Sequence, residues 1–268
     1  MSKIGFLTDS CSDIPQELAD KYGIEVVGFP INLDGTEYVE RKDFTNDQFY
    51  EMMRKAQGVP TTLIISLVAV LAGLIIGLFV AIAKMSKHRI LRGIATAYVD
   101  VLRGTPLMVQ VLILAYGLPQ LLKSNFGIQF NWTHFIIVGF IACGINSSAY
   151  MAEIIRSGLQ AVDIGQTEAA RSLGMSSRMT MRYVIVPQAF KIIVPAMGNE
   201  FIALIKETSI LSVVGIVEVT RQGTLWASSS FLSFQAYFGV AVIYLIMTLT
   251  LARLVSFVER RLAQSDRG

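Results

Sequence analysis

The hydrophobic pattern divides the chain near residue 61. Before that point apolar residues come in short runs separated by turn residues, whereas long apolar runs fill most of the 207 positions that follow. The first run, residues 62–83, contains no charged residue and is followed by the polar stretch KMSKHRILR. About 20 mainly apolar residues are enough for a helix to cross a bilayer, so this run predicts a membrane span.

Four further runs have the length and apolarity of a span: residues 105–122, 132–155, 187–205 and 235–258. The second begins near residue 105 because the apolar stretch 94–122 is interrupted by DVLRGTPLMVQ. Residues 209–219 are too few to cross, and predict a re-entrant or interfacial segment whose backbone is covered by protein. The expected fold class is therefore mainly α, a polytopic membrane protein with five transmembrane helices.

The first 61 residues have the pattern of a small, incomplete α/β segment. KIGFLTDS at 3–10 and IEVVGFPINLDG at 24–35 each predict a strand. Between them DIPQELADKYG predicts a helix with Pro15 near its first turn and Gly23 as its stop, and a second helix begins at Thr45. So short a segment buries little core by itself, and we expect two domains, 1–61 and 62–268.

Charge supports the same boundary. Residues 1–61 hold 6 Lys and Arg against 11 Asp and Glu, whereas residues 62–268 hold 17 against 9. Basic residues near span ends mark the cytoplasmic side, and this predicts a cytoplasmic C-terminus and a cytoplasmic loop at 156–191. The residues on that side are Lys84, Lys87, Arg89, Arg92, Arg103, Arg156, Arg171, Arg178, Arg182, Lys191, Arg260 and Arg261, against Lys123 and Arg221 opposite.

Neither a metal site nor a nucleotide site is expected. Cys11 and Cys143 fall one in each part and favour two separate buried thiols, and His88 and His134 stand without ligands at metal spacing. The sequence has no G-x-x-x-x-G-K-[ST] phosphate loop and no Gly-Lys pair, so the chain cannot cradle ATP phosphates itself.

The longest connection between spans contains DIGQTEAARSLGMS, which predicts a short helix. Gln166 or Thr167 lies near its N-cap, Glu168 in its first turn and Gly174 at its C-terminal stop. Small exposed residues allow another protein to approach closely, and Glu168 offers a charge to a basic partner. From spacing alone, a solvated connecting helix is the favoured interpretation.

This loop resembles the EAA loop of ABC-importer permeases. That family has the pattern Glu-Ala-Ala, then Gly, then Ile-x-Leu-Pro. Here the pattern is matched by Glu168, Ala169 and Ala170, by Gly174, and by VIVP ending at Pro187, with Val in place of Ile and of Leu. Three further stretches are similar to sequences of the polar-amino-acid subfamily and follow one another in the same order as there: VDVLRGTPLMVQ, AYMAEIIRSGLQAV and NEFIALIKETSILSVVGIVE. The resemblance covers about residues 58–265.

The resemblance implies a type I ABC importer permease that forms the pathway for a polar amino acid in a bacterial cell membrane. Its implied partners are a cytoplasmic ABC ATPase dimer, a second permease subunit and an extracytoplasmic substrate-binding protein; nucleic acid is not among them. The loop helix would dock on the ATPase, which makes the expected coupling residues Glu168, Ala169, Ala170, Gly174 and Pro187. The chain itself would be no enzyme.

Charged and polar residues at membrane depth are candidates for the pathway, because they usually face a cavity or a partner. They are Glu153, Asn199, Glu200, Lys206 and Glu207. For Glu153 an alternative is an ion pair with Arg156, at i+3 on the same helix face.

Two local features leave alternatives open. Pro187 and Pro195 predict bends in the fourth span, either for packing or for rocking during transport. Gly73-x-x-x-Gly77 in the first span allows close helix approach, either within the chain or between two subunits.

The opening residues resemble a different family. TDSCSDIP at 8–15 matches the start of the DegV family of fatty-acid-binding proteins, and VPTT at 59–62 is similar to a later motif of it. This resemblance implies a fusion, with Ser10 as an inherited lipid-binding residue. It also leaves two alternatives to a permease: a membrane-tethered lipid-binding module, and an ion-coupled carrier that needs no ATPase.

Overall fold

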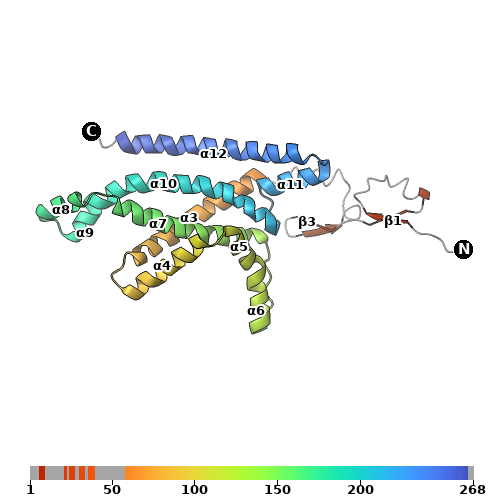
Figure 1. Ribbon diagram of the computed structural model, residues 1–268, viewed down its shortest axis with the longest axis horizontal. Helices are drawn as coiled ribbons and strands as arrows, with labels where there is room; N and C mark the ends of the chain where they lie inside the picture. The colour runs from red at the N-terminus through yellow and green to blue at the C-terminus, as the bar shows by residue number, and fades with distance from the viewer. Residues whose placement is uncertain are drawn as a thin grey trace. The chain divides into compact units, whose positions relative to one another are not determined.

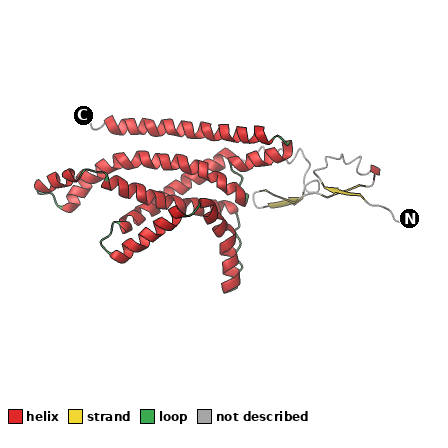
Figure 2. Ribbon diagram, viewed as in Figure 1, coloured by secondary structure: helices red, strands yellow, loops and turns green. Residues whose placement is uncertain are grey.

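The computed structural model describes residues 6–9, 21–22, 24–27, 30–33, 36–39 and 58–264. The chain separates into two compact units, Met1–Gln57 and Gly58–Gly268. Figure 2 shows strands only in the first unit and helices joined by short loops in the described part of the second.

The first unit contains two separate pairs of strands. β1 (Phe6–Asp9) pairs in parallel with β2 (Ile24–Val27), and Phe6 lies opposite Ile24. β3 (Pro30–Leu33) pairs antiparallel with β4 (Thr36–Val39), and Pro30 lies opposite Val39. The expectation of one strand at 24–35 was therefore wrong. Ser10, Cys11 and most of both predicted helices lie outside the described residues.

The second unit confirms the five predicted spans, each longer than the apolar run that predicted it. They cover Gly58–Lys84, Leu107–Phe126, Phe135–Gln160, Ser177–Val214 and Ser233–Leu262. The first, third and last correspond to α3 (Gly58–Lys84), α7 (Phe135–Gln160) and α12 (Ser233–Gln264). In Figure 1, α12 runs along α10, which it contacts.

The second and fourth spans are each assembled from several helical segments. The second combines α5 (Leu107–Leu112), the π-helix η2 (Ile113–Gly117) and α6 (Leu118–Phe126). The fourth combines α9 (Ser177–Thr180), the π-helix η3 (Met181–Ile185), α10 (Val186–Glu207) and the 3-10 helix η4 (Thr208–Val214). The separate apolar segment expected at 209–219 is thus mainly the end of the fourth span, and the chain turns at Gly215, where φ is 83°.

Both π-helices end two residues before a proline, Pro119 and Pro187. Proline has no N–H and clashes with the carbonyl one turn earlier, so the preceding turn widens to accommodate it. Pro195, by contrast, lies within α10 without ending the helix.

The core forms where α7 packs on α3. Ile65, Val138, Cys143 and Met151 are fully buried there, and α7 is the most buried of the five spans. A Cβ at Gly77 would lie 2.7 Å from the Cβ of Met151, and one at Gly73 would lie 2.8 Å from Oγ of Ser147. The Gly73-x-x-x-Gly77 motif therefore serves packing within the chain, because only glycine allows this approach.

Three of the described helices lie between spans; one of them, α8 (Ile164–Ser172), precedes the fourth span. α4 (Arg89–Gly104) follows the first span, and α11 (Val219–Ser230) precedes the last. Glu218 caps α11: its carboxylate accepts hydrogen bonds from the N–H groups of Thr220 and Arg221, at 2.8 and 2.6 Å. The Thr62 hydroxyl of α3 accepts from the Val219 N–H at 3.3 Å, which ties α11 to the first span.

Candidate functional site

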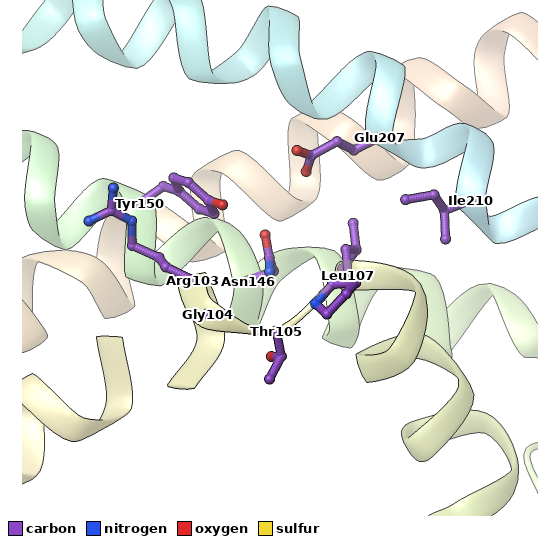
Figure 3. A pocket seen from close by; sticks show the side chains of 9 residues that line it. Arg103, Gly104, Thr105, Leu107, Asn146, Tyr150, Glu207 and Ile210 are labelled. Atoms are coloured by element: carbon purple, nitrogen blue, oxygen red, sulfur yellow. The ribbon is translucent and has the colours of Figure 1, made fainter. Parts of the chain in front are cut away.

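A cavity of about 380 Å³ with both polar and apolar lining residues opens where α4, α5, α7 and the end of α10 meet. Its walls come from the α4–α5 junction, from one face of α7 and from the α10–η4 junction (Figure 3). The lining residues are Arg103, Gly104, Thr105, Pro106, Leu107, Asn146, Tyr150, Glu207 and Ile210. This volume lies in the range of small-molecule sites.

Hydrogen bonds from two side chains hold the α4–α5 junction in place. The Gln110 amide donates to the carbonyls of Leu102 and Thr105, at 2.8 and 3.2 Å, and to the Thr105 hydroxyl at 2.9 Å. Asn146 on α7 donates to Oε1 of Gln110 at 3.1 Å. Pro106, the N-cap of α5, has an extended backbone and prevents α4 from continuing. The α4–α5 wall of the cavity is therefore non-helical, and these hydrogen bonds anchor it.

Groups of opposite charge line the cavity from different helices. Figure 3 shows the Glu207 carboxylate, the Tyr150 hydroxyl and the Asn146 amide turned toward the same space. Asn146 and Tyr150 are four residues apart on α7 and therefore share one face. The Arg103 guanidinium lies over the Tyr150 ring, 5.1 Å from its centroid, so aromatic contact positions the cation.

The structure separates the five pathway candidates from one another. Only Glu207 lines this cavity. Lys206 and Asn199 are exposed, and Glu200 is partly buried on α10 two turns before Glu207. Glu153 lies instead in an ion-pair cluster near the end of α7: it accepts from Lys84, and from Nε and Nη2 of Arg156 at 3.0 and 2.7 Å.

Arg103, Asn146 and Tyr150 are cavity residues that the sequence analysis did not select for the pathway. Arg103 was counted among the cytoplasmic basic residues, but it lies 14 residues along α4 and lines the same cavity as Glu207. A helix of that length extends about 21 Å, enough to carry the residue far from the basic end of α4. The break in apolarity at RGTP was the available signal.

The predicted loop helix is α8 (Ile164–Ser172), but its N-cap is Asp163 rather than Gln166 or Thr167. Oδ1 of Asp163 accepts from the Gly165 N–H at 2.6 Å, which satisfies one of the free donors of the first turn. At the other end, Gly174 adopts φ 81° and confirms the predicted stop. The Met175 N–H returns to the Ala170 carbonyl at 3.1 Å and completes this terminus.

The faces of α8 differ in exposure. Glu168 and Ala169 are exposed, whereas Ala170 is 4% exposed and packs inward, so Ala170 offers no surface to a partner. Two large apolar side chains at the ends of the helix face outward, Ile164 at 74% and Leu173 at 84% exposure. Exposed apolar side chains beside small residues are typical of a protein–protein contact.

A side-chain hydrogen bond joins α8 to the fourth span. The Gln188 amide donates to Oε1 of Gln166 at 3.3 Å and to the Val184 carbonyl at 3.0 Å. Pro187, also exposed, lies beside this contact and directly after the π-helix η3. Among the described residues, no group of three or more His, Cys, Asp or Glu side chains forms a metal site.

Two family models match the chain. Residues 73–264 match "Binding-protein-dependent transport system inner membrane component", and residues 3–72 match "Uncharacterised protein, DegV family". The second match extends into α3, which the structure describes as one continuous helix from Gly58 to Lys84.

Relatives match the same part of the chain over most of their own length. The arginine transport system permease protein ArtQ of Bacillus subtilis is 38% identical over 78% of this chain and 93% of its own. The probable glutamine ABC transporter permease protein GlnM of the same species is 37% identical, over 76% and 91%. The nopaline transport system permease protein NocM of Agrobacterium fabrum is 36% identical, over 75% and 84%.

Solved structures show the same fold. A crystal structure of an amino acid ABC transporter with histidines is 46% identical, with a TM-score of 0.71, and the match covers 80% of this chain and 96% of the other. The inward-facing MetNI methionine ABC transporter is 18% identical with a TM-score of 0.56, over 80% and 99%, and supports the fold alone.

Proposed function

The chain belongs to the family of binding-protein-dependent transport system inner membrane components, and on that premise we propose that polar amino acids cross the membrane through the cavity lined by Glu207. It is a multi-pass permease subunit of an amino-acid ABC importer of the inner membrane. A separate ATPase hydrolyses ATP, and a substrate-binding protein completes the system.

The charge pattern of the cavity carries the proposal about substrate. Glu207 can accept from an α-ammonium group, while Arg103, held over Tyr150, can bind an α-carboxylate. Asn146 adds an amide near both. Relatives named for arginine and glutamine transport have substrates with this zwitterionic backbone in common. Polar side chains would be tolerated because Thr105, Asn146 and Tyr150 also line the cavity.

The proposed ATPase contact is the exposed face of α8. Glu168 and Ala169 supply a charge and a close approach, and the apolar ends Ile164 and Leu173 flank them. We expect Gly174 to act by ending the helix and Pro187 by stiffening the start of α10, since neither needs to touch the partner. The ATPase would be a dimer, matched by a second permease subunit.

A single helix can transmit the motion of this contact to the cavity. The Gln166–Gln188 hydrogen bond joins α8 to the start of α10, and Glu207 is the last residue of α10. With 22 residues, α10 is about 33 Å long, enough to span the hydrocarbon. The wide turn of η3 would be the flexible point, and the rigid α10 would displace Glu207 relative to Asn146 and Tyr150.

The proposed orientation puts the α8 loop and the C-terminus in the cytoplasm. Arg156, Arg171, Arg178 and Arg182 lie on the side of α8, and Arg260 and Arg261 lie at the same end of the last span. Basic residues near span ends favour that side.

We further propose that residues 1–61 are an incomplete DegV-like α/β fragment fused to the permease domain 62–268, without a role in transport. The cavity and the α8 surface both belong to the second unit. Lipid binding at Ser10 remains a prediction outside the described residues.

Purification from native membranes in mild detergent tests the assembly. A C-terminally tagged chain is expected to copurify with an ABC ATPase, and mass spectrometry reports whether residues 1–61 are still attached. Uptake of arginine and glutamine into proteoliposomes containing the purified assembly and its binding protein should require internal ATP. Uptake that persists without ATPase but collapses with the ion gradient would favour an ion-coupled carrier instead.

A further inference from the structure

A second cavity, distinct from the one lined by Glu207, has three basic residues among the six that line it. It has a volume of about 530 Å³ and is lined by Lys84 and Met85 at the end of α3, Arg92 and Thr96 on α4, and Arg156 and Gln160 at the end of α7. Arg92 and Thr96 are four residues apart, as are Arg156 and Gln160, so each pair shares a helix face. Three helices thus direct three cations to one hollow.

The cavity carries an excess of positive charge. Glu153 neutralises part of it, because its Oε1 accepts from Lys84 and its Oε2 from Arg156. Both carboxylate oxygens are therefore engaged. No carboxylate forms a salt bridge with Arg92 among residues 58–264. One acid and three bases leave two positive charges in excess at the hollow.

Two of the cations are held in fixed positions. The side chain of Lys84 is 16% exposed and that of Arg156 is 30% exposed, unlike freely solvated surface cations. Arg156 also donates through Nη1 to Oε1 of Gln160 at 2.5 Å. Preoriented guanidinium groups bind phosphate oxygens through paired hydrogen bonds.

The position of the cavity indicates the source of the anion. Lys84 and Gln160 are the last residues of the first and third spans, and the ends of spans of this length reach the headgroup region. An exposed apolar stripe on α3 leads toward the cavity: Ile75, Phe79, Ile82 and Met85 are 61%, 67%, 55% and 41% exposed. A headgroup in the hollow would place its acyl chains beside this stripe, whereas free phosphate would make no use of it.

We infer that this cavity binds the phosphate headgroup of an anionic phospholipid, with Arg92 as the principal ligand. Basic hollows between transmembrane helices are suited to such headgroups. Lys84 and Arg156 contribute the remaining positive potential, and Thr96 can donate to a phosphate oxygen. Headgroup binding here is independent of which amino acid the permease transports.

Native mass spectrometry of the full chain in detergent tests the site. The probes are phosphatidylglycerol and phosphatidylcholine with identical acyl chains. Phosphatidylglycerol should be retained more strongly, and Arg92→Gln should weaken its binding about fivefold, the contribution of one basic residue near an anionic surface. Arg92→Lys keeps the positive charge but loses the paired hydrogen bonds, so its affinity should lie between those of the wild type and Arg92→Gln, and it controls for folding.

Arg89→Gln is the matched control, since Arg89 is exposed on the same helix three residues earlier but does not line the cavity. It should leave phosphatidylglycerol binding unchanged. Equal losses in the two Gln variants would mean diffuse attraction to the basic surface and would overturn the inference. So would equal retention of both lipids. Displacement of phosphatidylglycerol by millimolar inorganic phosphate would reassign the site to free phosphate and overturn the lipid assignment.

Discussion

Tyr244 of α12 donates a hydrogen bond of 2.8 Å to Oε2 of Glu218, the fully buried N-cap of α11. The Thr220 hydroxyl lies 3.2 Å from the same tyrosine oxygen. Burial raises the pKa of Glu218, while its hydrogen bonds from Thr220, Tyr244 and Arg221 oppose the shift. This cluster joins the last span to the rest of the described helices through a polar contact whose strength depends on protonation.

The stability of the second unit should therefore depend on pH through Glu218. Folding raises the pKa of this carboxyl, so the folded state binds more protons than the unfolded state. Its contribution to the free energy of unfolding is complete below the ordinary Glu pKa and is lost as the pH rises through the pKa of the folded state. We expect the thermal midpoint in detergent to fall over that interval in the wild type. Glu218→Gln should remove this part of the pH dependence.

The same variant should lower the overall stability. A Gln side chain has one acceptor oxygen in place of two, so at least one of the three donors is left unsatisfied, at a cost of about 1–3 kcal/mol. Tyr244→Phe keeps the carboxyl and serves as the control, because it should retain a pH-dependent midpoint. An unchanged pH profile in Glu218→Gln would refute the assignment.

The close approach of α3 and α7 predicts that alanine destabilises the protein at Gly77 but not at a glycine outside this contact. In Gly77→Ala the new methyl would lie 2.7 Å from Cβ of Met151 and 2.8 Å from the Ser148 carbonyl oxygen. Overpacking of this kind costs about 1–3 kcal/mol, measurable as a lower thermal midpoint. Gly93→Ala, where no atom lies within 4 Å of the new methyl, should stabilise α4 by up to about 1 kcal/mol. A tolerated Gly77→Ala would argue against tight packing here.

Charge reversal on α8 should separate ATP hydrolysis from transport. Glu168→Lys changes an exposed side chain, so the protein should still reach the membrane at normal levels. If Glu168 meets a basic group of the ATPase, ATP-driven uptake should fall at least about tenfold, the effect of about 1.4 kcal/mol. Glu259→Lys reverses an exposed charge near the end of α12 and should have no such effect. Full uptake by Glu168→Lys would remove Glu168 from the contact.

Loss of the cavity carboxylate should reduce transport without disrupting assembly. Glu207→Gln removes a charged hydrogen-bond acceptor, typically about 1.5–3 kcal/mol, so maximal uptake at saturating binding protein should fall about tenfold or more. The copurifying ATPase should be retained. Glu200→Gln is the control, because Glu200 lies on the same helix but does not line the cavity. Equal effects of the two substitutions would indicate that the cavity is not the pathway.

The sequence alone determined the features that depend on local chemistry. The apolar runs predicted all five spans, because a span is set by length and hydrophobicity within one segment. The stop at Gly174 was equally predictable, since glycine adopts positive φ without steric cost. The Glu153–Arg156 pair, given as an alternative, follows from helical spacing and is present. The helix start was not predicted correctly, because several residues near 163–167 are capable caps.

Only the tertiary structure decided which residues meet across helices. Glu207 and Asn146 are 61 positions apart yet line one cavity, and Lys84 joins Glu153 across 69 positions. Gly77 could have faced a lipid, another subunit or α7, and packing selected α7. Such contacts depend on how helix faces dock, which hydrophobic periodicity does not specify. A charged residue at membrane depth therefore predicts only that it has a partner, and the packed helices determine which one.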